Sequence, residues 1–169
     1  MAAKETWDKL KFFRPDSTID NWGDHELISD NHILRLDDFR RWIGVPIYVT
    51  RGVAETGHSD GSQHYPKFDE AGNLVGGATA TDIVVPNYPR SVFDLILDAT
   101  RFGFTGIGYY PHWRWNGDTV GGLHLDSRPL KWDADETINY AHSRWIGTLV
   151  DGKMNYESMT YERLKILGG

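Results

Sequence analysis

Three side chains of metal-binding types stand out along the chain: His64, Asp82 and His124. Imidazole nitrogens and carboxylate oxygens are zinc ligands, and three protein ligands with a water in the fourth position are typical of catalytic zinc. Asp82 runs into an apolar stretch, where burial of a lone carboxylate is costly unless a partner such as a metal ion is present. The three residues therefore predict a catalytic zinc centre. The alternative is that each one makes only local hydrogen bonds near a turn.

The segments around these residues follow a particular order. Ser62-Gln63-His64 comes first, followed by Ala80-Thr81-Asp82, then by the run from Gly106 to Pro111, and finally by the run from His124 to Arg128. This order resembles that of the zinc D-Ala-D-Ala carboxypeptidases and the related phage endolysins, which cut peptide bonds in bacterial cell walls. The resemblance covers residues 12–128. It implies a hedgehog/DD-peptidase-like fold in which the three residues named above bind zinc.

The spacing of the first two ligands departs from the family pattern. In the family the first His and the Asp lie close in sequence with a Gly between them, whereas Asp82 follows His64 by 18 positions. Residues 65–74 contain Asp-Glu-Ala-Gly-Asn, a turn-forming cluster between residues that are suited to strands. An inserted hairpin accounts for the spacing, and we expect this hairpin to leave the ligands in place.

A second departure affects the general base. The family usually has a Glu three residues before the last ligand, or a His two residues before it, and these positions are Gly121 and Gly122. A positioned acid or base contributes about 10²- to 10⁴-fold to the rate, so an active enzyme needs a substitute. His112, on an aromatic loop between two predicted strands, is the leading candidate, ahead of Asp118 and His58. The alternative for His112 is an ordinary solvent-exposed loop histidine.

Two further charged residues are candidates for catalytic roles. The family commonly reads Ser-Gly-Tyr-Arg after the strand that is expected at residues 46–50, and Arg51 stands three positions before the place of that substrate-facing Arg. Arg51 is therefore the candidate for contact with substrate. Asp126 and Arg128 share a strand face with His124 because side chains alternate with a period of two. Asp126 is expected to orient a ligand together with Arg128, with an ordinary ion pair at a strand end as an equal alternative.

Composition limits the classes of partner. The chain has 169 residues, a hydrophobic content of 40% and a formal net charge of −6, and no segment gathers the basic residues that phosphate binding requires. Nucleic acid is therefore not an expected partner. No Cys is present, and no run approaches the ~18 apolar residues of a membrane span, so membrane insertion is not expected. The N-terminus lacks the apolar segment of a secretory signal peptide.

Aromatic residues are frequent, with seven Trp, eight Tyr and seven Phe. Most of them are expected to serve in ordinary packing. A minority is suited to line a groove for a glycan or a peptide, or to form an assembly contact, because aromatic side chains dominate the energetics of interfaces.

The predicted elements give an α+β fold, a small antiparallel sheet with helices packed against it. Ser29 is a suitable N-cap for a helix that ends before Gly44, and Ser91 for a second helix that ends before Gly103. Strands are expected at residues 46–50, 80–85, 106–110 and 122–128, with a hairpin-like excursion between the last two. The zinc ligands would lie on or beside these strands.

The two ends lie outside this core. Residues 1–28 are expected to form an irregular N-terminal arm, residues 29–130 the peptidase-like core and residues 131–169 a C-terminal extension. In the extension we expect a helix over residues 135–145, a tight hairpin around Asp151-Gly152 and a short helix over residues 160–167. The extension is suited to docking or assembly, or to capping the sheet.

Two functions are compatible with these features. The first is a phage-derived zinc peptidase that cleaves stem or cross-link peptides of the peptidoglycan in bacterial cell walls. The second is a phage virion or tail-assembly protein that keeps the fold and the zinc site but lacks the base, with other phage structural proteins as partners. Either protein would be made in the host cytoplasm and would act at the cell wall or within the virion.

Overall fold

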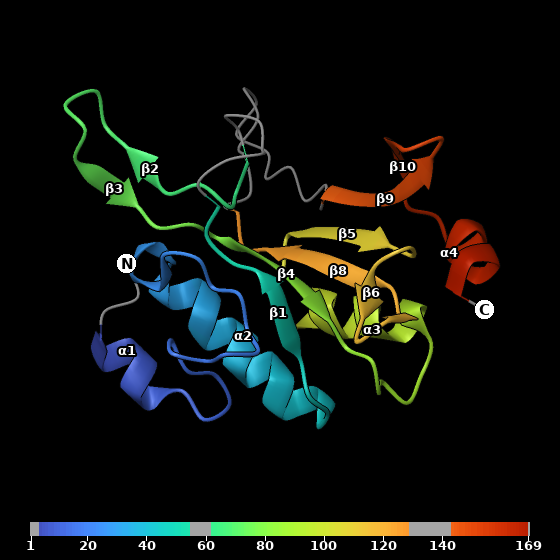
Figure 1. The fold of residues 1–169 in the computed structure, drawn as a ribbon, viewed down its shortest axis with the longest axis horizontal. Coiled ribbons are helices and arrows are strands. Elements are labelled where there is room, and N and C mark those ends of the chain that lie inside the picture. The colour runs from blue at the N-terminus through green and yellow to red at the C-terminus, as the bar shows by residue number, and fades with distance from the viewer. Residues whose placement is uncertain (1–3, 55–61, 129–142, 169) are drawn as a thin grey trace.

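A six-stranded sheet forms the centre of the computed structural model, which describes residues 4–54, 62–128 and 143–168 (Figure 1). Its order is β1-β4-β8-β5-β9-β10. The strands are β1 (Tyr48–Arg51), β4 (Ala80–Val84), β8 (Gly122–Asp126), β5 (Gly106–Tyr110), β9 (Ser143–Val150) and β10 (Lys153–Ser158). The mixed α+β architecture is confirmed. The antiparallel expectation is wrong at one place, because β5 and β9 pair in parallel.

Two predicted helices are confirmed with their ends. α2 (Asp30–Ile43) follows Ser29 and ends at Gly44, whose φ of 72° suits a residue without a side chain. α3 (Val92–Arg101) begins with a capping box, in which Ser91 and Asp94 each bond the backbone N–H of the other. These caps satisfy backbone donors at the helix start and fix where α3 begins.

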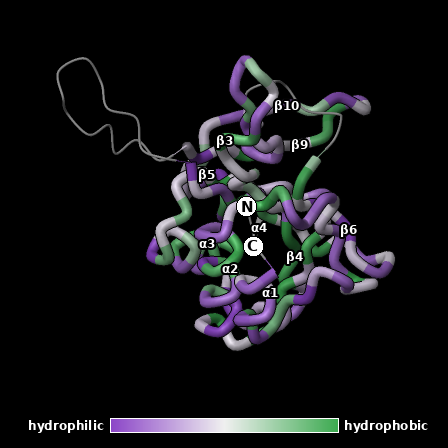
Figure 2. Tube along the Cα trace, turned by 90° about the vertical axis from the view of Figure 1, so that its left-hand side faces the viewer, coloured by the Kyte–Doolittle hydropathy of each residue, from purple (hydrophilic) through white to green (hydrophobic). Residues whose placement is uncertain are grey.

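The hydrophobic core lies between one face of the sheet and the two helices. The strand residues that face the helices include Ile83, Leu123 and Ile107. They are buried together with Leu36 and Phe39 of α2. Figure 2 shows hydrophobic stretches around β4 and hydrophilic stretches along the outer turns near α1 and α2. Because side chains alternate along a strand, the residues between these core positions lie on the opposite face, which carries the polar residues of interest.

The N-terminal segment is more closely packed than an arm. It contains α1 (Lys4–Lys9), which the sequence did not predict, and a short 3-10 helix (His25–Leu27). Trp7, Phe13 and Trp22 are buried in the core, and their rings meet edge to face at centroid distances of 5.1 and 5.3 Å. This segment therefore contributes to the same core as the sheet.

The C-terminal segment completes the sheet. The hairpin of β9 and β10 turns at Asp151-Gly152, and α4 (Tyr161–Gly168) follows it, so both predictions are confirmed. The helix expected over residues 135–145 is wrong at residues 143–145, which begin β9; residues 135–142 lie outside the described part of the chain. β9 forms its parallel pairing with β5 through Ser143 to Ile146.

Two small hairpins project from the main sheet. β2 (Lys67–Phe68) pairs with β3 (Leu74–Gly76), which confirms the inserted hairpin. β6 (Arg114–Trp115) pairs with β7 (Asp118–Thr119) around Asn116-Gly117, which confirms the excursion between β5 and β8.

Candidate metal centre

The three predicted ligands converge at one point. Asp82 on β4 and His124 on β8 are directly opposite in the antiparallel pair, and His64 reaches them from the loop before β2. Asp82 Oδ1 lies 3.1 Å from His64 Nε2 and 2.9 Å from His124 Nδ1, and the two nitrogens are 3.1 Å apart. All three residues are buried. The group could therefore hold a metal ion.

The outer nitrogens of the two histidines indicate which tautomers are present. His64 Nδ1 lies 2.7 Å from the carbonyl oxygen of Gly52, and His124 Nε2 lies 3.2 Å from Asp126 Oδ2. Both oxygens are acceptors, so each of these nitrogens carries the proton. In the neutral rings the inner nitrogens are then unprotonated. Two nitrogen lone pairs and a carboxylate oxygen consequently face one another, which is unfavourable unless a cation lies among them.

The three ligand atoms are close enough together to hold one metal ion, and zinc gives a scale for comparison. Ligand atoms about 2.0–2.1 Å from a tetrahedral zinc lie roughly 3.3 Å from one another, and the observed separations of 2.9–3.1 Å are slightly closer. In metal sites the outer nitrogen of a ligating histidine usually donates to a carbonyl or a carboxylate oxygen, which fixes the tautomer and the orientation of the ring. The donor set of two imidazoles and one carboxylate leaves a fourth position for water.

Without a metal ion, a proton takes the place of the cation. Burial lowers the pKa of His124, but hydrogen bonds to Asp126 and Asp82 outweigh burial and raise this pKa to about 9. Burial raises the pKa of Asp82, and hydrogen bonds from His124 and His64 outweigh it, so that this pKa falls well below its usual range. The metal-free centre thus holds an imidazolium beside a carboxylate.

Asp126 makes the predicted contacts with its neighbours. Its side chain accepts from His124 Nε2, while Arg128 Nε donates to Asp126 Oδ1 at 2.8 Å. Burial raises the pKa of Asp126, but the bonds from His124 and Arg128 outweigh it and lower this pKa. An ion pair that also holds the ring of a candidate ligand has more consequence than an exposed pair at a strand end.

Sequence reasoning did not find His32, a buried residue of α2 behind the centre. Its Nδ1 lies 2.8 Å from Ser127 Oγ and its Nε2 lies 3.1 Å from Thr81 Oγ1. Burial lowers the pKa of His32 to about 3, so the ring is neutral at ordinary pH. Because Thr81 and Ser127 adjoin Asp82 and Asp126 in sequence, His32 connects α2 to the two strands that carry the candidate ligands.

The register of the sheet places five residues in one row across the strands. Arg51 pairs with Asp82, Asp82 with His124, His124 with Gly108, and Gly108 with Trp145. Arg51 therefore lies on the edge strand next to a candidate ligand, and its contact with substrate stays a prediction. Trp145, which the sequence did not indicate, lies at the other end of the row, and its ring centroid is 5.2 Å from that of His124.

His112 lies in the turn after β5. Its ring meets that of Tyr110 edge to face at 6.2 Å, and Tyr110 in turn accepts a hydrogen bond from Trp145. His112 Nδ1 is buried and has no hydrogen-bond partner among the described residues. Its role as a base stays a prediction. Asp118 is exposed in β7, and His58 lies outside the described residues.

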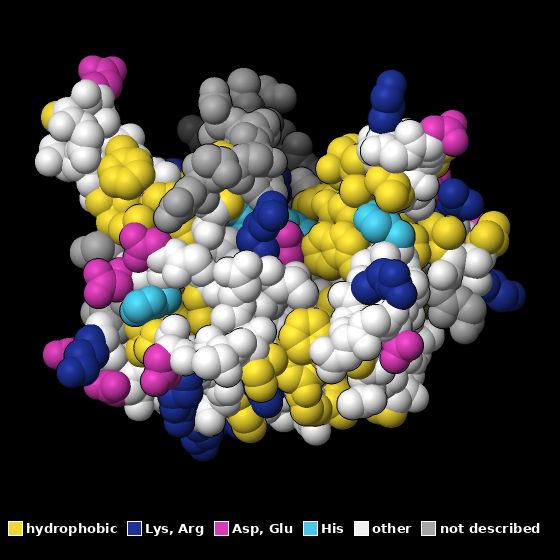
Figure 3. Space-filling view, viewed as in Figure 1, with side chains coloured by type: hydrophobic (Ala, Val, Ile, Leu, Met, Phe, Trp, Pro, Cys, Tyr) yellow, Lys and Arg dark blue, Asp and Glu magenta, His cyan; other side chains and the backbone are white. Residues whose placement is uncertain are grey.

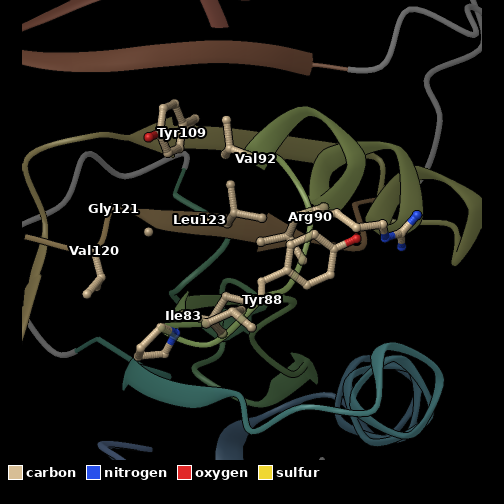
Figure 4. A pocket seen from close by; sticks show the side chains of 12 residues that line it. Ile83, Tyr88, Arg90, Val92, Tyr109, Val120, Gly121 and Leu123 are labelled. Carbon is tan, nitrogen blue, oxygen red and sulfur yellow. The ribbon is translucent and has the colours of Figure 1, made fainter. Parts of the chain in front are cut away.

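The two glycines at the family's base positions cannot simply be exchanged for larger residues. Gly121 has a φ of 68°, and a Cβ at this position would lie 3.0 Å from the ring of Tyr109. A Cβ at Gly122 would collide with Trp113. Gly121 also lines a cavity of about 200 Å³ with Ile83 and Leu123, on the helix-covered face of the sheet (Figure 4). A side chain at residue 121 would therefore enter this cavity, on the side of the sheet away from Asp82 and His124.

The inserted hairpin should be dispensable for metal binding. Replacing residues 68–75 by two glycines is expected to leave the metal content unchanged, because Lys67 and Gly76 are already paired neighbours. The base of the excursion is held separately, by the bond from the Thr79 N–H to the Gln63 carbonyl oxygen at 2.9 Å. Elemental analysis and circular dichroism would check this expectation. Loss of metal from a folded variant would show that the hairpin shapes the centre.

None of the described helices is long and apolar enough to cross a membrane. Comparison of the chain with protein families, with curated proteins and with solved structures finds no match.

Proposed function

We propose that the protein is a zinc-dependent peptidase that acts on peptides of bacterial peptidoglycan, in the manner of phage endolysins. The observation that carries the proposal is the convergence of two imidazole nitrogens and one carboxylate oxygen, each imidazole being oriented by a second hydrogen bond. Zinc, when bound, lowers the pKa of its water towards ~7 and polarises the peptide carbonyl. The order of motifs described from the sequence supports peptidoglycan as the substrate.

The residues of the chain have separate tasks in this proposal. Gly52 and Asp126 fix the rings of His64 and His124, so that little reorganisation is needed when the ion binds. Arg51, on the edge strand beside Asp82, is the proposed partner for a carboxylate of the peptide substrate. Proton transfer falls to His112, which is the proposed substitute for the missing base.

Cleavage of purified peptidoglycan tests the proposal. The zinc-loaded protein should release peptide amino groups, and His112→Ala should reduce the rate by about 10²- to 10⁴-fold if this residue transfers the proton. His64→Ala provides the inactive control. Gly121→Glu should not raise activity, because residue 121 lies on the face away from the ligands. An inert wild-type protein with its zinc in place would contradict the peptidase proposal.

The second candidate is a structural protein of a phage virion or tail that retains the fold and the metal. Two observations favour it: Gly121 and Gly122 leave the family's base positions empty, and the β9-β10 hairpin exposes large apolar side chains. Leu149, Val150 and Tyr156 are 54%, 53% and 61% exposed, which suits a contact with other phage proteins. In this case metal removal would weaken assembly or folding, and peptidoglycan would stay intact.

A further inference from the structure

Four aromatic side chains form a continuous surface beside the metal centre. This aromatic surface consists of Tyr110, Trp113, Trp145 and Tyr156. It begins at His124, whose ring centroid is 5.2 Å from that of Trp145. Trp145 Nε1 donates to the Tyr110 hydroxyl at 3.1 Å, and the rings of Tyr110 and Trp113 stack at 4.4 Å with an angle of 7° between their planes.

Tyr156 extends this surface onto the edge strand. It pairs with Gly147 across β9 and β10, and a Cβ at Gly147 would lie 2.4 Å from the ring of Tyr110, so the ring of Tyr110 lies over the glycine that Tyr156 faces. In the space-filling view a hydrophobic patch adjoins the His and acidic side chains near the middle of this face (Figure 3). The aromatic surface is therefore continuous with the candidate metal centre and leads away from it towards the edge of the sheet.

Glycines form the floor beneath the rings. A Cβ at Gly108 would collide with the indole of Trp145, one at Gly147 with the ring of Tyr110, and one at Gly122 with Trp113. The missing side chains let the rings lie close to the sheet, which limits their motion. Rigid aromatic rings lose little conformational entropy when they bind a ligand, so they are effective contacts.

We propose that the aromatic surface binds a sugar ring of the glycan strand to which the peptide substrate is attached. The proposal rests on the peptidase function and deepens it. A pyranose ring has a flat face of C–H groups that packs on aromatic rings, and equatorial hydroxyls that need polar partners at the rim. The four rings supply the apolar contact and the hydroxyls of Tyr110 and Tyr156 the polar partners, since the single N–H of Trp145 already donates to Tyr110. None of the four side chains is charged at neutral pH, which suits a neutral sugar.

An apolar segment of a partner protein is the competing occupant. Such a segment would anchor large side chains in pockets at the centre of an interface. Tyr110 and Trp113 instead stand parallel, and their neighbour Trp145 directs its indole N–H to a hydroxyl. Aromatic rings with polar hydroxyls among them, beside the candidate metal centre, favour the sugar ring.

Titration with a tetramer of β-1,4-linked N-acetylglucosamine tests the proposal. The indole N–H resonances of Trp145 and Trp113 should shift in nitrogen-proton correlation spectra of the full chain. Trp42, which is 62% exposed on α2 and serves as the internal control, should not shift. The absence of shifts at Trp145 and Trp113, or an equal shift at Trp42, would overturn the proposal.

A pair of matched variants measures the contribution of the surface. Tyr156→Ala should weaken binding of the tetramer by about tenfold, the equivalent of one aromatic contact, and its exposed position on an edge strand should leave the fold intact. Tyr161→Ala, at a tyrosine 55% exposed on α4, should bind like the wild type. Unchanged binding by Tyr156→Ala would contradict the proposal.

Removal of the metal separates this inference from the peptidase proposal. Because the aromatic surface does not include a candidate ligand, the chelator-treated protein should still bind the tetramer. For the zinc-loaded protein, sugar binding without cleavage of peptidoglycan peptides would refute the peptidase and leave the sugar site standing. Cleavage of peptidoglycan peptides without shifts of the Trp145 and Trp113 indole resonances would refute the sugar site and leave the peptidase standing.

Discussion

Replacing His64 by alanine should abolish metal binding, taking the purified protein from about one zinc ion per chain to almost none. His64 contributes one of three ligand atoms that lie within 4.8 Å of one another. The two remaining ligands, Asp82 and His124, lie on adjacent strands and cannot enclose the ion by themselves. Metal binding would then be too weak to offset the repulsion between the carboxylate and the imidazole lone pair. Elemental analysis of protein prepared without added metal, followed by titration with zinc, measures the effect.

The matched control is His25→Ala. His25 belongs to the short 3-10 helix and packs edge to face against Trp7 at 5.7 Å, so it is a histidine with a packing role outside the group of candidate ligands. This variant should retain the metal content of the wild type. Wild-type protein that contains no transition metal and does not take up zinc would refute the metal centre.

Zinc should reverse the pH dependence of stability. In the metal-free protein the pKa of His124 is raised from 6.5 to about 9. A group whose pKa is higher in the folded state stabilises the fold fully below its unfolded pKa, and this stabilisation is lost as the pH rises through the folded pKa. The free energy of unfolding of the metal-free protein should therefore fall by on the order of 3 kcal/mol between pH 6.5 and pH 9.

With zinc bound, the free energy of unfolding should instead rise with pH between pH 6 and pH 8. The ion displaces the proton from the inner nitrogen of His124, so binding strengthens as the pH rises, and an excess of ion near 1,000 times its dissociation constant adds about 4 kcal/mol. Urea unfolding with chelator or with zinc at several pH values compares the two slopes. In His124→Asn the free energy of unfolding should lose both its fall with pH in chelator and its rise with pH in zinc. If the wild-type free energy of unfolding changes with pH in the same way under both conditions, the assignment of His124 as a ligand is contradicted.

The candidate ligands could be found from the sequence because each stands in an informative local context. Asp82 and His124 are polar residues inside apolar runs, and local alternation is enough to place them on strands. The ends of α2 and α3 depend on local signals as well, since Ser91 caps the first turn of α3 and Gly44 ends α2; Ser29 stands at the N-cap position of α2, where its hydroxyl makes no capping hydrogen bond. These features depend on neighbours in sequence, which a single chain displays.

Other parts of the centre depend on partners that are distant in sequence. The parallel pairing of β5 and β9 has no turn signal, because the strands are joined by a long connection. Without that pairing, Trp145 cannot be assigned to the row of His124. The sequence also could not show to which face of the sheet Gly121 belongs. Its φ of 68° interrupts the alternation of side-chain directions just before β8.

The position of β9 also sets an order of events during synthesis. All three candidate ligands have left the ribosome before β9 and β10, which follow them in the chain. A nascent chain could therefore bind its ion on a four-stranded sheet whose β5 edge is still unpaired, and unpaired strand edges promote association between chains. Early metal capture would hold β4 and β8 together during this interval, so zinc-starved cells should accumulate aggregated nascent chains before they show any loss of the finished protein.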